Sequence, residues 1–173
     1  MSIHLLSVGR KFSRRFFGFA MAATALMMST ASVYAQNTCY PLNGHYNEHI
    51  VTQNCNSPVG LCIAGDYDGV IQGSFSGAAT SLTPSADTPT TGVLFFTSDS
   101  VIHAKVNGKE GDLIIKNAGA FQSVGDGNIV DVQIITGGTG GLVGASGAIR
   151  ASGLFNPATG TGSSEYDGMI CLP

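Results

Sequence analysis

The chain has 173 residues, of which 24 are glycine, four are cysteine and none is tryptophan, and only 11% are charged. This length fits one domain, or two at most, and the low charge with high glycine content excludes a coiled coil, a helical repeat array and a charged disordered tail. Eight Lys and Arg against eleven Asp and Glu give a net charge of −3, so the chain lacks the basic excess of proteins that bind nucleic acid.

The N-terminal segment has the pattern of an export signal. Four basic residues precede an apolar, Ala-rich run from Phe16 to about Met28. The run is shorter than the ~20 apolar residues that span a bilayer, and Val33-Tyr34-Ala35 has the short side chains that suit signal peptidase. We therefore predict a signal peptide over residues 1–35, with an uncleaved anchor as the alternative.

The export route and the charge of the mature chain follow from this segment. Ser13-Arg14-Arg15-Phe16-Phe17 is similar to the bacterial twin-arginine signal, which exports folded proteins; the general secretory route is the alternative. Either route predicts a periplasmic or secreted protein with no membrane association after cleavage. Removing the leader leaves four basic residues against eleven acidic ones, a net charge of −7, which disfavours nucleic acid and anionic lipid as partners.

All four cysteines follow the signal segment. An even number of cysteines in an exported chain indicates disulfide bonds, and four cysteines allow three pairings. We favour Cys55–Cys62, which closes a short loop, and Cys39–Cys171, which ties the two ends of the mature chain together. A zinc site is the rival interpretation, but no Cys-x-x-Cys pair is present. Nothing in the sequence indicates a metal or another cofactor.

The mature chain has the texture of an all-β protein. Residues 36–63 are polar, and we expect a loop-like N-terminal segment there that carries the disulfide loop. From 64 to 173 short apolar or alternating runs recur between turn residues, and no stretch of ten residues has a helical stripe. We predict strands near 64–76, 78–83, 92–98, 100–107, 111–117, 119–124, 129–136, 146–155 and 164–171. We favour a closed antiparallel eight-stranded β-barrel over a sandwich, because closure removes exposed strand edges.

Local patterns specify some of these elements further. Residues 66–77 alternate between an apolar face and a polar face, which predicts one long strand with a wet face. Asn107-Gly108 predicts a two-residue hairpin, because both residue types tolerate positive φ. Residues 81–91, with two prolines and six Ser or Thr, form the longest clear loop of the prediction.

A glycine-rich segment lies between two predicted strands: Thr136-Gly137-Gly138-Thr139-Gly140-Gly141-Leu142-Val143-Gly144-Ala145-Ser146-Gly147-Ala148-Ile149. It resembles the plant allene oxide cyclase motif, in which a strand runs into Thr-Gly-Gly-Ser-Gly and then Gly-Ala-x-Gly. Dirigent proteins carry a similar strand–turn–strand, and Asp131–Ile135 and Tyr166-Asp167-Gly168 lie at compatible spacing. The segment lacks the Gly-Lys-Ser/Thr of a P-loop, and its glycines suit a tight turn.

This resemblance to allene oxide cyclase and dirigent-like barrels implies an apolar cavity. Allene oxide cyclases close a cyclopentenone ring, and dirigent proteins steer the coupling of phenolic radicals; in both, the cavity holds a reactive molecule in one shape. The resemblance implies an exported barrel that binds an apolar small molecule and promotes its cyclisation, isomerisation or stereo-directed coupling without a cofactor. A non-enzymatic barrel that binds a hydrophobic ligand or serves a structural role is the alternative. The resemblance also allows a homo-oligomer.

Candidate ligand-binding residues come from the inward-looking strand faces. They are Tyr67, Ile71, Phe75, Phe121, Phe155 and Tyr166. An apolar cavity with tyrosine hydroxyls suits a hydrophobic small molecule, and plain core packing is the alternative. The catalytic residues of the plant cyclase lie in a segment that has no residue-by-residue match here, so we assign no catalytic residue.

The remaining polar candidates are placed in solvent. They are His45, Glu48, His49, His103, Asp131 and Gln133. His45 and His49 lie four residues apart, but nearby Pro and Gly disfavour a helix, so we expect a solvated loop near the barrel mouth rather than a metal site. Asp131 and Gln133 alternate with three apolar residues, which we place inside the barrel.

Overall fold

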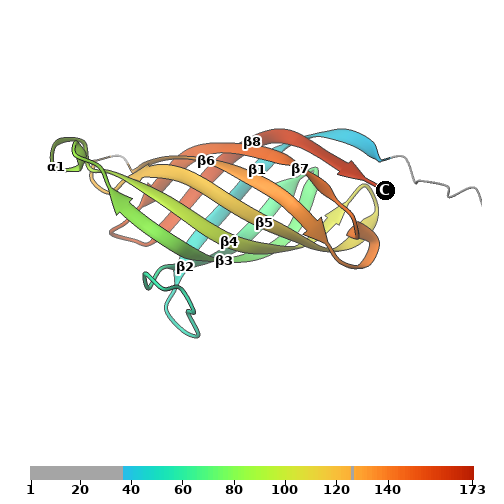
Figure 1. The fold of residues 1–173 in the computed structure, drawn as a ribbon, viewed down its shortest axis with the longest axis horizontal. Helices are drawn as coiled ribbons and strands as arrows, with labels where there is room; N and C mark the ends of the chain where they lie inside the picture. Colours follow the sequence, from blue (N-terminus) through green and yellow to red (C-terminus); the bar gives the residue numbers. More distant parts are fainter. Residues whose placement is uncertain (1–36, 126) are drawn as a thin grey trace, which may run out of the picture. The chain divides into compact units, whose positions relative to one another are not determined.

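A computed structural model describes residues 37–125 and 127–173, in which eight strands form one closed antiparallel barrel (Figure 1). The order of the strands along the chain is also their order around the barrel, and β8 pairs with β1 to close it. The elements are β1 (Thr38–Val51), β2 (Cys62–Gly69), β3 (Ile71–Pro84), α1 (Thr88–Thr91), β4 (Val93–Val106), β5 (Lys109–Gln122), β6 (Asn128–Gly138), η1 (Gly140–Leu142), β7 (Ser146–Asn156) and β8 (Thr161–Leu172). The predicted fold class is confirmed.

The predicted signal peptide, residues 1–35, lies outside the described residues. Among the residues that the structure describes, no helix has the length and hydropathy needed to cross a bilayer.

The barrel begins earlier in the chain than predicted, because 38–51 is a strand rather than a polar loop. The alternation of polar and apolar residues that marks a strand is incomplete here, because one of the inward positions is the charged Glu48 while the outward positions are polar. Pro41 lies where β1 pairs with β8 but not with β2, whose pairing starts at Gly44, and proline is tolerated where one side of a strand has no ladder. His45 and His49 are therefore exposed on the outer face of a strand rather than in a loop.

Several predicted strand boundaries also differ from the structure. The predicted strand 64–76 is a hairpin: β2 ends at Gly69, and Tyr67 pairs with Gly73 of β3. In contrast, β4 and β5 each join two predicted strands. The predicted breaks fall where β4 and β5 turn polar or small side chains inward, so the apolar alternation is interrupted although the hydrogen-bonded ladder continues.

The glycine-rich segment lies at one end of the barrel. It connects β6 to β7 through η1, and Gly140 and Gly144 have positive φ values of 56° and 79°. Between these glycines Leu142 turns into the core, where it is 0% exposed and belongs to the same buried cluster as Leu113 and Ile149. This half of the barrel is filled by apolar side chains.

The opposite end is formed by the β1–β2, β3–β4, β5–β6 and β7–β8 connections. The predicted loop 81–91 is shorter than expected, because β3 continues to Pro84 and α1 follows. The connection between β1 and β2, residues 52–61, is longer and carries Cys55.

Both predicted disulfide bonds are present. Cys39 and Cys171 are register partners on β1 and β8, so their bond reinforces the seam where the two ends of the chain close the barrel. Cys55 and Cys62 are separated by seven positions and close the loop that leads into β2. The described residues contain no free cysteine.

The predicted hairpin at Asn107-Gly108 is confirmed, with φ values of 49° and 77°. We expect Gly108→Ala to lower the free energy of unfolding by about 1 kcal/mol, because an L residue is disfavoured at positive φ. A Cβ at Gly108 would meet no atom within 4 Å, so the loss isolates the backbone effect. The matched control is Gly137→Ala, whose Cβ would make one ordinary contact at 4.0 Å without positive φ. Urea denaturation measures both; equal losses would contradict the expectation.

Candidate functional site

A cavity lies inside the barrel, toward the end formed by the β1–β2 and β3–β4 connections. It is partly open to solvent and offers about 70 Å³ to the centres of water molecules. Its apolar lining consists of Leu61, Ile63, Phe75, Ala79, Phe96, Ile102, Ile115, Phe121, Ile129 and Phe155. Its polar lining consists of Tyr46, Glu48, Tyr67, Ser98, Ser100, Asn117, Asp131 and Gln133. Since one water needs roughly 10–15 Å³ on this measure, the space holds several waters or a small organic molecule.

A hydrogen bond across the barrel separates the cavity from the packed half. The hydroxyl of Tyr67 on β2 donates to Oε1 of Gln133 on β6 at 2.8 Å. In a closed ring of eight strands, β2 and β6 are four positions apart and therefore opposite one another. Tyr46 stacks on Tyr67 with ring centroids 4.8 Å apart, and Phe75 packs edge-on against both rings. These side chains form a rigid floor, with polar atoms held at fixed positions.

Two buried carboxyl groups line the cavity beside this floor. Glu48 on β1 is 5% exposed and Asp131 on β6 is 9% exposed. Nε2 of Gln133 donates to Oδ2 of Asp131 at 3.2 Å, whereas Oε1 of Glu48 has no hydrogen-bond partner among the described residues. Among the described residues, no Lys, Arg or His lines the cavity, so none of them places a positive charge beside the buried carboxyl groups.

Burial of this kind disfavours the charged form of a carboxyl group. Burial, together with the charge of Asp131, raises the pKa of Glu48 from 4.5 to about 7. Burial raises the pKa of Asp131 from 3.8 to about 6, although the hydrogen bond from Gln133 lowers it. At a pH between these two pKa values the pair therefore holds about one proton, which makes it both a proton donor and a proton acceptor.

The tyrosines of the floor stay protonated. Burial raises the pKa of Tyr46 and of Tyr67, and the nearby Asp131 carboxylate raises both further. Their hydroxyl groups are consequently neutral hydrogen-bond donors over the whole physiological range.

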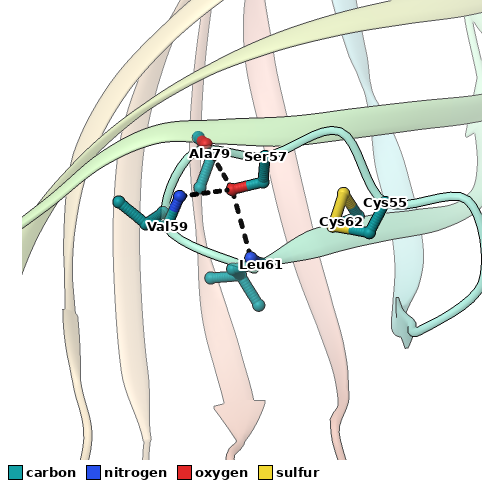
Figure 2. The surroundings of a disulfide bond; sticks show 6 residues. All are labelled: Cys55, Ser57, Val59, Leu61, Cys62 and Ala79. Carbon is teal, nitrogen blue, oxygen red and sulfur yellow. Dashed lines mark hydrogen bonds between the residues drawn. A yellow bond between two sulfur atoms is a disulfide. The ribbon is translucent and has the colours of Figure 1, made fainter.

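The loop closed by the second disulfide bond shapes the rim of the cavity (Figure 2). The Ser57 hydroxyl donates to the carbonyl of Ala79 at 2.6 Å and accepts from the backbone N–H groups of Val59 and Leu61. The N–H of Ala79 in turn donates to the carbonyl of Leu61 at 2.9 Å. Leu61 and Ala79 line the cavity. The hydrogen bonds of Ser57 therefore fix the position of this loop against β3.

The structure divides the predicted ligand-binding residues. Tyr67, Phe75, Phe121 and Phe155 line the cavity. Ile71 and Tyr166 lie outside the lining, in the packed half, where the hydroxyl of Tyr166 accepts a hydrogen bond from the N–H of Ile71 at 3.1 Å. The two sets differ because the interior is hollow in one half only.

The outward placement of Asp131 and Gln133 is wrong. Both side chains point into the barrel, whereas Val130, Val132 and Ile134 on the outer face of β6 are 55%, 44% and 43% exposed. The physical reason is the cavity itself, which makes the inner face of β6 polar at this level. The sequence did contain a pattern that indicates the inward placement. Ile129 and Ile135 alternate in step with Asp131 and Gln133 along β6, so all four lie on one face of the strand, and both isoleucines face inward.

The remaining polar candidates occupy the surface. Nε2 of His45 lies 3.8 Å from Oδ2 of Asp68, and His103 is exposed, as predicted, beside Asp112. Hydrogen bonding to His103 holds the pKa of Asp112 below its usual value. Across 37–125 and 127–173, no group of three His, Cys, Asp or Glu side chains is placed to hold a metal ion.

Comparison with known proteins finds similarity in structure only. No family model and no curated protein sequence matches the chain. Among solved structures, the pterocarpan synthase dirigent protein GePTS1 is 18% identical, with 80% of this chain and 87% of that chain covered and a TM-score of 0.35. The pterocarpan synthase dirigent protein PsPTS1 is 15% identical, with 80% and 98% covered and a TM-score of 0.34.

Proposed function

We propose that the barrel binds a small, largely apolar molecule in its cavity and promotes the cyclisation or isomerisation of that molecule by proton transfer. The observation that carries the proposal is the buried pair of Glu48 and Asp131 in a cavity whose other walls are mostly apolar. Four of the predicted ligand-binding residues, Tyr67, Phe75, Phe121 and Phe155, would contact the body of the molecule.

The chemistry follows from the protonation state of the pair. The protonated carboxyl group donates a proton to an oxygen of the ligand, and the ionised carboxylate accepts one from a hydroxyl group or an acidic C–H. The pair then exchanges roles, so no proton is gained or lost overall. The apolar wall holds the ligand in one conformation and keeps water away from the reacting atoms, which favours ring closure.

The setting supports a secreted or periplasmic location for this activity. Two disulfide bonds suit an oxidising, extracytoplasmic compartment. The alternative function is a binding barrel in which the carboxyl groups hold a ligand without transferring a proton. Oε1 of Glu48, which has no hydrogen-bond partner among the described residues, could accept a hydrogen bond from such a ligand.

The test starts from the protein purified from its own host. Native mass spectrometry identifies the retained molecule, and incubation of that molecule with the protein in D2O reports proton transfer as deuterium in the ligand or product. We expect Glu48→Gln and Asp131→Asn each to slow deuterium incorporation by a factor of ~10²–10⁴, and Asp66→Asn, an exposed carboxyl group on the outer face, to leave the rate unchanged. A ligand returned unaltered and without deuterium supports the binding barrel instead. Repeated absence of any ligand contradicts both functions.

A further inference from the structure

The cavity has an uncompensated negative charge. Glu48 and Asp131 line it without a basic neighbour, and all four basic residues of the described chain are engaged elsewhere on the surface. Their partners are Glu110 for Lys105, the carbonyl of Pro173 for Lys109, Asp99 for Lys116 and Asp167 for Arg150. Residues 37–125 and 127–173 therefore supply no Lys or Arg side chain to this pair.

A second observation points to a ligand rather than to a purely structural pair. Glu48 and Ser98 line the cavity and are each 5% exposed, and neither Oε1 of Glu48 nor the hydroxyl oxygen of Ser98 has a hydrogen-bond partner in the described part of the chain. The amide oxygen of Asn117, on β5 opposite β1, is a further acceptor without a partner. Buried polar atoms are rarely left unsatisfied, and every one of these three can accept from a donor.

The aromatic lining favours one kind of donor. Tyr46, Tyr67 and Phe75 pack together beside the carboxyl pair, and Phe121 lies between Phe96 and Phe155 with centroid distances of 6.3 and 6.4 Å. Aromatic rings attract cations through their negative faces, and this attraction is stronger where water is excluded. Carboxylates, unpartnered acceptors and aromatic rings around one cavity all select for positive charge and all reject an anion.

We infer that the ligand of this cavity carries a protonated amine on an apolar body. The ammonium group donates to Glu48 and neutralises the one negative charge that the carboxyl pair retains, while the aromatic side chains enclose the rest of the molecule. The inference rests on the proposed function, because it requires the cavity to be a ligand site, and it adds the charge of the ligand. The mature charge of −7 would also draw cations toward the barrel.

Four probes that share a phenyl ring and differ in charge and in hydrogen-bonding groups test the inference on the full mature protein: benzylamine, benzyltrimethylammonium, benzyl alcohol and benzoate. Isothermal titration calorimetry is expected to give benzylamine at least a tenfold lower Kd than benzyl alcohol, and no binding of benzoate. Benzyltrimethylammonium has the charge without N–H donors, so we expect it to bind more weakly than benzylamine but more tightly than benzyl alcohol.

Matched variants assign the preference to the carboxyl pair. Glu48→Gln should raise the Kd of benzylamine about tenfold and change that of benzyl alcohol less than twofold, as charge-assisted hydrogen bonds are stronger than neutral ones. Asp131→Asn gives a second reading if Glu48→Gln does not fold. Phe121→Leu should raise the Kd of benzylamine more than that of benzyl alcohol, because it removes an aromatic face and leaves the carboxyl pair in place. If benzyl alcohol binds as tightly as benzylamine, the inference is overturned while the cavity remains a ligand site; if no probe binds, the proposed function falls as well.

Discussion

Replacing Cys39 and Cys171 together by serine is expected to lower the free energy of unfolding by about 5 kcal/mol. The two residues are 132 positions apart, so their bond removes a large amount of conformational freedom from the unfolded chain. The bond also lies at the seam between β1 and β8, the strand pair with the greatest sequence separation in the barrel. Loss of the bond therefore affects the β1–β8 pairing, which joins the residues that are farthest apart in the sequence.

The second disulfide bond provides the matched comparison. Cys55 and Cys62 are separated by only seven positions, so their replacement by serine should cost about 2 kcal/mol. Urea denaturation of the two double variants under non-reducing conditions measures the difference, and the m-value should rise more for the long-range pair because its unfolded state becomes less compact. Equal losses would show that local packing, rather than chain entropy, determines the effect.

The second large effect is a fall in stability as the pH rises. A carboxyl group whose pKa is raised by folding binds more protons in the folded state, so its contribution to stability is complete below its unfolded pKa and decreases as pH rises through its folded pKa. For Glu48, whose pKa is raised from 4.5 to about 7, the loss between about pH 4 and pH 8 amounts to about 3 kcal/mol. Asp131 contributes a loss of the same sign, because burial raises its pKa to about 6.

Glu48→Gln isolates this effect. The variant has no titrating group at position 48, so its stability should decline less than that of the wild type as the pH rises. The decline that remains is that of Asp131, whose pKa is raised by its own burial. Chemical denaturation at a series of pH values measures both slopes, with Asp66→Asn as the exposed control. Asp112 acts in the opposite direction, since its pKa is lowered, but it is unchanged in every variant. A wild-type stability that stays flat or rises from pH 5 to 8 would refute the burial of an uncompensated carboxyl pair.

Local chemistry determined those features that depend on few neighbours. Asn107-Gly108 specifies its hairpin because its two positive φ values are a property of two residues. The glycine-rich segment specifies a tight connection for the same reason, with Gly140 and Gly144 at positive φ. Of the three possible cysteine pairings, the one that we favoured is present, and recurrent short strands without helical periodicity indicated an all-β barrel.

The tertiary structure decided which side chains face the interior of the hollow half. A strand pattern assigns residues to two faces, but it names the inner face only when that face is apolar. On β6 the rule failed, because Asp131 and Gln133 face a cavity while Val130 and Val132 face outward. On β1 the inward Glu48 interrupts the apolar alternation, so the segment was predicted as a polar loop rather than as a strand.

The sequence by itself thus determined an all-β chain with its tight turns, and it favoured the disulfide pairing that the structure confirms, including Cys39–Cys171. Only the tertiary structure brought Glu48 and Asp131, which are 83 positions apart, to one cavity and placed the basic side chains of the described residues outside it. The reason is that barrel closure sets strands from distant parts of the chain across from one another, and desolvation, which raises the two pKa values, arises only when all eight strands enclose that space.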